Sequence, residues 1–236
     1  MIVFVKLLLA HLLGDFILQP TTWVLDKEQK KYKSPFLYIH VLLHGLLAWL
    51  LICDVAFWPY ALLLAVVHGA IDLMKLQWQT SKTKRYWFIG DQTLHIFSLV
   101  GITLLWNGTD LNTYIIDNRF WIYFTGILLL TTPASLVIKN IISIWTPDEP
   151  PVKEADLQNA GKYIGILERL FVFFFIVTGY FASIGFLMAA KSIFRFGDLT
   201  QSKDRKLTEY VLIGTLISFG VAIAVGFLVK YALRLL

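Results

Sequence analysis

The sequence is poor in charged residues and in cysteine. Only 16% of its 236 residues are charged and 57% are hydrophobic, whereas about 25% of a soluble domain is charged. The single cysteine, Cys53, excludes a disulfide within the chain. Basic residues are scattered over short connections without a recognition motif, so we expect no nucleic-acid partner. The composition therefore indicates an integral membrane protein in contact with membrane lipids.

Apolar segments long enough to span a membrane recur along the chain, because a spanning helix needs about 20 residues. Seven such segments cover residues 2–19, 36–53, 57–77, 86–106, 120–144, 164–194 and 209–235. Pro133 lies inside the fifth segment and is a candidate break. We predict an all-α bundle of about seven transmembrane helices. Four helices form a front unit in 1–106 and three form a back unit in 107–236, with a polar cytoplasmic linker near 146–163.

Two basic connections predict the orientation of the front unit. Lysine and arginine gather at 26–33 and 75–85, whereas the alternate connections carry mainly aspartate. By the positive-inside rule, the two basic connections are cytoplasmic. Basic residues also follow the sixth segment, which seven plain spans would place outside, so the topology of the last helices stays open.

Among the seven segments, only the first four contain histidine or aspartate, and such groups are costly in a membrane unless they are paired or functional. All five histidines and three aspartates there form pairs with i, i+4 spacing, which puts each pair on one helix face. The pairs are His11 with Asp15, His40 with His44, His68 with Asp72, and Asp91 with His95. Because both hairpins carry such pairs in the same order, we interpret the front unit as a duplicated hairpin.

The four pairs fall into two layers when they are counted from the cytoplasmic end of each segment. Three aspartates and His40 lie about five residues in, and the other four histidines lie about nine residues in. At about 1.5 Å per residue, these depths are roughly 7 Å and 13 Å. Because the segments alternate in direction, shared depths are expected only if all four helices turn one face to a common centre.

Imidazole and carboxylate groups that face one centre are typical of a transition-metal site. We expect a divalent transition metal, zinc first, with iron or manganese as alternatives. The expected metal ligands are His11, His44, His68, His95, Asp15, Asp72 and Asp91. The three aspartates are also the expected catalytic groups; in the sharpest form of this hypothesis the histidine layer holds the metal and the aspartate layer carries the chemistry. The residues expected to support the ligands or to contact substrate are Gln19, His40, Lys75 and Gln92.

Three functions are compatible with this site. The first is metal-assisted hydrolysis of a lipid or lipid-linked substrate. The second is transport of a metal ion or protons through the same residues, and the third is a structural or interaction subunit with a polar core. Apart from Lys6, Ser98, Thr103 and a few Trp and Tyr residues, the outer halves of the four segments are apolar, which favours a one-sided site over a pathway through the membrane. The oligomeric state stays open.

Lys191 and Arg195 are a second candidate site. They stand four residues apart at a helix end, where they could contact a lipid phosphate. The alternative is that both are membrane-surface anchors with snorkelling side chains.

The motifs HLLGDFILQP (11–20), HGAIDLMK (68–75), DQTLH (91–95) and AAKSIFRF (189–196) resemble the bacterial integral membrane family called "domain of unknown function 3307". The resemblance extends over nearly the whole chain. It implies a location in the bacterial inner membrane and no particular activity. A looser, architectural similarity links the chain to seven-helix intramembrane hydrolases such as ceramidases and adiponectin receptors, which hold zinc with three histidines and one aspartate. Their motifs do not match here residue by residue.

Overall fold

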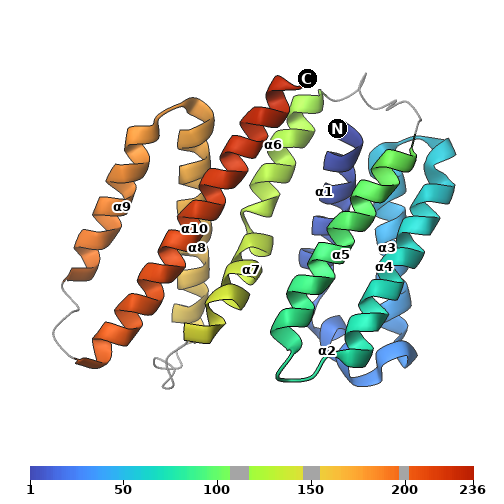
Figure 1. Cartoon of the computed structure of the whole chain (residues 1–236), viewed down its shortest axis with the longest axis horizontal. Coiled ribbons are helices and arrows are strands. Elements are labelled where there is room, and N and C mark those ends of the chain that lie inside the picture. Colours follow the sequence, from blue (N-terminus) through green and yellow to red (C-terminus); the bar gives the residue numbers. More distant parts are fainter. Residues whose placement is uncertain (107–116, 146–154, 197–201) are drawn as a thin grey trace. The chain divides into compact units, whose positions relative to one another are not determined.

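The computed structural model is built from α-helices (Figure 1). It describes residues 1–106, 117–145, 155–196 and 202–236. No strand occurs in these ranges, and the prediction of an all-α fold is confirmed. By its internal contacts the chain forms two compact units, Met1–Thr125 and Gly126–Leu236. The predicted boundary after residue 106 lies at the edge of the described residues.

Four long helices make up most of the first unit. They are α1 (Ile2–Phe16), α3 (Pro35–Ile52), α4 (Trp58–Trp78) and α5 (Lys84–Leu105). Helix α1 packs on α3 and α5, and α4 packs on the same two helices, so the four helices enclose one interior (Figure 1). The connections contain α2 (Thr21–Lys30) and the short 3-10 helices η1 (Lys31–Lys33) and η2 (Val55–Phe57).

Proline marks where two of these helices begin. Pro35 is the first residue of α3 and Pro59 the second residue of α4. A helix start is the place where a missing backbone N–H removes no hydrogen bond. These local signals explain why the observed starts of α3 and α4 lie within a few residues of the predicted ones.

One half of the interior of the first unit is apolar. Its core consists of Leu7, Ala10, Ala48, Ile52, Phe57, Ala61, Leu64, Leu99 and Ile102. Small residues bring α3 and α4 close together: a Cβ on Gly45 would lie 3.0 Å from the Cβ of Ala65. Close approach of this kind holds helices together in a membrane, where burial of apolar surface adds little. The polar pairs are confined to the other half.

The first predicted segment is bent. Helix α1 ends at Phe16 and α2 begins at Thr21, and the two helix axes differ in direction by 79°. Stacking of Trp23 on Phe36, with ring centroids 5.3 Å apart, fastens α2 to α3. Glu28 of α2 also forms an ion pair with Lys84 at the start of α5. The two basic connections therefore lie at the same end of the first unit (Figure 1).

In the second half of the chain the structure describes five α-helices and one 3-10 helix, and residues 146–154 and 197–201 lie outside the described residues. They are α6 (Asn118–Leu129), α7 (Thr132–Ile142), the 3-10 helix η4 (Ser143–Trp145), α8 (Ala155–Thr178), α9 (Phe181–Phe196) and α10 (Ser202–Arg234). Helix α10 packs along α8 and α7. The linker predicted near 146–163 lies largely at 146–154, outside the described residues, and its last part belongs to α8.

The prediction of one span over 164–194 is wrong. The chain turns between α8 and α9 at Gly179, whose φ is +88°. Glycine adopts this backbone conformation without the steric cost of a Cβ, so a single residue is enough to end α8. The apolarity of 164–194 did not reveal the turn, because both helices are apolar.

Five helical stretches within the described residues are long and apolar enough to cross a membrane. They are Pro35–Ile52, Val55–Trp78, Lys84–Leu105, Asn118–Trp145 and Glu209–Arg234. A sixth is added if the bent pair α1 and α2 counts as one span. The predicted number of seven is not confirmed.

The predicted break near Pro133 is confirmed, and a buried arginine stabilises it. Helix α6 ends at Leu129 and α7 begins at Thr132, with Pro133 in its first turn. The guanidinium of Arg169 donates hydrogen bonds from Nε to the carbonyl oxygen of Leu130 (2.7 Å) and from Nη2 to that of Thr131 (3.2 Å). It also donates to two hydroxyl oxygens, those of Ser135 (2.6 Å) and Ser218 (3.1 Å). Arg169 thus joins α8 to the helix break and to α10.

Candidate metal centre

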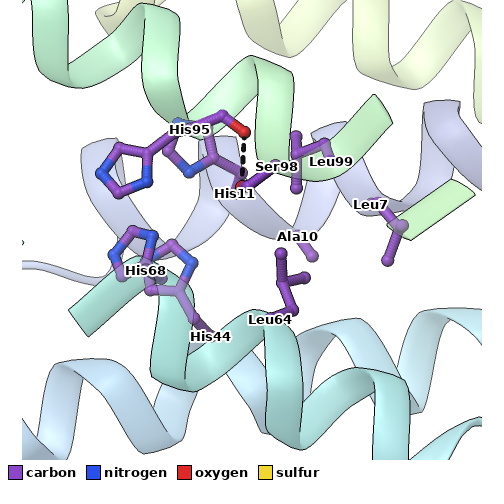
Figure 2. Close-up of a pocket in the computed structure, with 9 residues that line it drawn as sticks. All are labelled: Leu7, Ala10, His11, His44, Leu64, His68, His95, Ser98 and Leu99. Carbon is purple, nitrogen blue, oxygen red and sulfur yellow. Dashed lines mark hydrogen bonds between the residues drawn. The ribbon is translucent and has the colours of Figure 1, made fainter. Parts of the chain in front are cut away.

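The first unit brings its five histidines and three aspartates together in the polar half of its interior. Each of the four long helices contributes the i, i+4 pair that the sequence predicts for it. The imidazoles pack against one another: ring centroids are 3.6 Å apart for His44 and His68, and 4.1 Å for His68 and His95. Figure 2 shows these rings and that of His11 gathered between the helices. All five imidazoles are buried.

Asp15 lies at the centre of one part of this cluster. Its Oδ1 is 3.0 Å from Nε2 of His44, 3.2 Å from Nε2 of His40 and 3.6 Å from Nε2 of His68. Its Oδ2 is 3.7 Å from Nε2 of His11. One carboxylate from α1 thus contacts imidazoles from α1, α3 and α4.

The other part of the cluster contains the two remaining carboxylates. Nε2 of His95 lies 3.4 Å from Oδ1 of Asp91 and 3.6 Å from Oδ1 of Asp72. Nε2 of His40 lies 3.6 Å from Oδ2 of Asp72 and so connects the two parts. Oδ1 of Asp91 and Nε2 of His95 are buried and have no hydrogen-bond partner within the part of the chain that the structure describes. The two atoms lie side by side in a buried site, where they could bind a cation or exchange a proton.

Three groups of side chains have the separation that metal ligands need. The first group consists of His11, Asp15, His44 and His68. The second consists of His40, His68 and Asp72, and the third of Asp72, Asp91 and His95. Within each group, one ligand atom from every residue lies within 4.8 Å of all the others. Atoms bound to one zinc ion are about 3–3.5 Å apart, because each bond is about 2.0–2.2 Å. Small rotamer changes would therefore suffice to close any of the three groups around a metal.

His68 and Asp72 belong to two groups each, so neighbouring groups share ligands. A shared carboxylate can bridge two metal ions, as in di-metal helical bundles. Every group also mixes imidazole and carboxylate. The separation into a metal-binding histidine layer and a catalytic aspartate layer stays a prediction, and the geometry favours metal binding by members of both layers.

Two of the residues expected to support the ligands contact them directly. Nε2 of Gln92 donates hydrogen bonds to Oδ2 of Asp15 and to Oδ2 of Asp91, both 3.1 Å long. Nζ of Lys75 donates to Oδ2 of Asp91 at 2.8 Å. His40 is a full member of the cluster. Gln19 lies in the connection between α1 and α2, where its Nε2 is buried without a partner within the described ranges.

Lys27 is a member of the site that the sequence analysis treated only as part of a basic connection. Its Nζ donates a hydrogen bond to Oδ2 of Asp72 at 2.8 Å, and its side chain is only 7% exposed. The available signal is the i, i+4 spacing of Trp23 and Lys27, which puts both on the face of α2 that packs inward. That signal was weak because α2 was expected to be a loop.

A small cavity of about 10 Å³ adjoins the imidazoles. This is close to the volume that one water molecule needs. Figure 2 shows the polar side of its lining, His11, His44, His68 and His95, and the apolar side, which includes Leu7, Leu64 and Leu99. The apolar side belongs to the core of the first unit, so the cluster is closed on that side.

Gly14 tests whether the imidazole positions matter for metal binding. A Cβ on Gly14 would lie 2.4 Å from Nε2 of His44, so Gly14→Ala must displace that ring. We expect at least about a tenfold fall in metal affinity, measured by elemental analysis after dialysis against graded chelator, although no ligand is replaced.

Gly90 gives the matched control, because a Cβ there meets nothing within 4 Å. Both changes gain up to about 1 kcal/mol of helix propensity, so this gain cancels between the two variants. Equal metal content in Gly14→Ala and Gly90→Ala would show that His44 is not needed as a ligand.

Lys191 and Arg195 are described only in part. Nζ of Lys191 donates a hydrogen bond to Oε2 of Glu168 on α8 at 2.6 Å. The side chain of Arg195 lies outside the described residues. A lipid-phosphate site at this helix end stays a prediction.

Comparison with known proteins identifies the family. A family model described as "Protein of unknown function (DUF3307)" matches residues 3–122, which include every histidine and aspartate of the cluster. No curated protein and no solved structure matches the chain. The motif at 189–196 lies beyond the matched residues, so the match covers about half of the chain and essentially the first unit. The chain therefore belongs to the DUF3307 family of proteins of unknown function, as its His and Asp motifs predicted.

Proposed function

We propose that this protein is a metal-dependent hydrolase of the bacterial inner membrane, with a lipid or lipid-linked substrate. The observation that carries the proposal is the set of three overlapping ligand groups inside an apolar helical unit. Burying several carboxylates and imidazoles close together costs desolvation free energy, and binding of a metal ion offsets that cost. Zinc fits the mixed nitrogen and oxygen ligands, and iron or manganese would fit them too.

We assign the residues of the cluster to two roles, metal ligands and a general base. His68 and Asp72, which belong to two groups each, would hold the metal together with the imidazoles around them. A bound divalent ion would supply a Lewis acid and activate a water molecule. Asp91 has one oxygen fixed by Lys75 and Gln92, while its other oxygen has no hydrogen-bond partner within the described residues. In this assignment that oxygen does not bind the metal; it lies 3.4 Å from Nε2 of His95 and can accept a proton from water, as a general base must.

The closed apolar side of the cluster supports hydrolysis over transport. A transporter needs polar groups along a path through both leaflets, whereas the interior beyond Leu7, Leu64 and Leu99 is an apolar core. The basic connections lie at the polar end of the unit, which by the positive-inside rule faces the cytoplasm. Substrate would therefore reach the site from the cytoplasmic leaflet.

Elemental analysis followed by a lipid assay tests the proposal. The protein is purified without chelator and without a histidine tag, and we expect at least one equivalent of zinc, iron or manganese per chain. Incubation with bacterial lipid extract should then release products that mass spectrometry detects, and removal of the metal should stop the release. Far less than one equivalent of metal would contradict the proposal. Metal flux into proteoliposomes without any lipid product would support the transporter instead.

A further inference from the structure

We infer that the substrate presents a phosphate group to the site, and that Lys27 and Lys75 bind this group. The inference rests on the proposed function, because it takes the cluster to bind metal. It goes further by naming the chemistry of the substrate and two residues that recognise it.

The two lysines reach the same part of the cluster from different helices. Lys27 from α2 contacts Asp72, and Lys75 from α4 contacts Asp91, each with its Nζ 2.8 Å from a carboxylate oxygen. Asp72 and Asp91 belong to one ligand group, together with His95. Both ammonium groups therefore lie next to the metal position that Asp72 would help to form, with Asp91 beside it as the base. Lys75 is 23% exposed and Lys27 only 7%, so Lys75 lies nearer the surface.

The site has a net positive charge once metal is bound, and this charge favours an anionic substrate. The three aspartates and two lysines together carry one more negative than positive charge, with the imidazoles neutral as ligands. One divalent ion makes the total positive by one charge, and a second would make it positive by three. Excess charge inside a membrane protein is costly unless it is paired. A neutral substrate would leave that excess unpaired, whereas an anionic one removes it.

A phosphate group matches the arrangement better than a carboxylate. Lysine binds phosphate as a point charge, and phosphate offers three or more oxygens in different directions. These oxygens can contact a metal and two ammonium groups from separate helices at once, whereas the two oxygens of a carboxylate lie in one plane. Cationic groups and metal ions around a phosphoryl group also stabilise the charge that develops during its transfer.

The reaction of such a substrate is hydrolysis of a phosphate ester or anhydride. The oxygen of water forms a bond to phosphorus, and the bond from phosphorus to the leaving oxygen breaks. A proton of the water passes to the second carboxylate oxygen of Asp91, and Asp91 then gives that proton to the leaving oxygen. No oxidant, reductant or second substrate is required.

The test measures metal content and phosphate binding separately on the full chain in maltoside micelles, which contain no phosphate. The ligands are inorganic phosphate and phosphatidate, with diacylglycerol as the uncharged lipid control. The variants are Lys27→Met and Lys75→Met, alone and together. Lys33→Met and Lys82→Met are matched controls, because both of these lysines are exposed on the same two connections.

We expect the metal-loaded protein to bind phosphatidate or inorganic phosphate, and the double variant to bind at least about tenfold more weakly. Metal content of the double variant should be unchanged or higher, because two competing cations are removed. Lys27→Arg keeps the positive charge and should bind phosphate more tightly than Lys27→Met. This comparison separates loss of charge from misfolding. Binding of phosphatidate alone identifies a lipid headgroup, and binding of inorganic phosphate alone identifies a soluble source of the same chemistry.

Two results would overturn the inference while leaving the proposed function intact. One is metal-loaded protein that binds neither ligand, and the other is a metal-loaded double variant that binds phosphate as well as the unaltered chain. If the unaltered chain holds no metal, the proposed function fails first and the inference fails with it. The separate measurement of metal content distinguishes these cases.

Discussion

Replacing Asp72 by Asn is expected to lower metal affinity by at least about 100-fold. Loss of a residue that only orients a ligand already costs about 10- to 100-fold in affinity. Asp72 is itself a ligand candidate and belongs to two of the three groups. The change also leaves the buried ammonium of Lys27 opposite a neutral amide in place of a carboxylate. Metal per chain, measured by elemental analysis after dialysis against graded chelator, gives the result directly.

Two other aspartates separate the possible explanations of that loss. Asp91 belongs to one group only, so Asp91→Asn should retain more metal than Asp72→Asn while abolishing turnover through loss of the base. Asp54 accepts a hydrogen bond from the backbone N–H of Ala56 beside η2, outside the cluster, so Asp54→Asn should change neither property. Full metal content in Asp72→Asn with an emptied Asp91→Asn would reverse the roles assigned to the two carboxylates.

Replacing Arg169 by Met is expected to destabilise the second unit by several kcal/mol. The carbonyl oxygens of Leu130 and Thr131 would lose the donors that Arg169 supplies at the helix break. Each buried acceptor left without a donor costs about 1–3 kcal/mol. The apparent melting temperature in maltoside micelles should fall by on the order of 10 °C. Metal content of the folded fraction should not change, because Arg169 does not belong to the candidate metal centre.

Lys162 provides the control for this change. It is an exposed cation on the same helix, so Lys162→Met removes the same charge without removing a buried donor. Arg169→Lys should be intermediate, because one ammonium group cannot reach all the acceptors that lie around the edge of the guanidinium. Equal melting temperatures for Arg169→Met and Lys162→Met would show that the helix break is stable without its arginine.

Much of the candidate metal centre could be predicted because its signals are local. The i, i+4 pairs lie on continuous apolar helices, so helical periodicity alone puts both members of a pair on one face. The cost of ionisable groups among apolar residues then requires those faces to meet. His40 and Gln92 were expected to support the ligands or to contact substrate; the structure brings both into contact with the predicted ligands, and His40 is itself a member of a ligand group. Spacing along one helix does not indicate how far a side chain reaches toward another.

The back of the chain could be predicted less well because its features depend on single residues and distant contacts. The turn at Gly179 interrupts an apolar stretch that periodicity alone reads as one helix. Pro133 could be identified as a break because proline lacks the N–H that a helix interior needs. The arginine that compensates the break comes from α8, far away in sequence, and no spacing rule indicates it.

The sequence by itself determined that the protein is helical and apolar. It also determined that the first half carries one polar face on each of four helices, with side chains of the types that bind metal ions. These properties follow from composition and helical period, which are local. Only the tertiary structure decided that α1 bends by 79° into α2, that this bend brings Lys27 to Asp72, and that three ligand groups share His68 and Asp72. The physical reason is that these features depend on contacts between helices, and a contact between distant residues leaves no periodic trace in either segment.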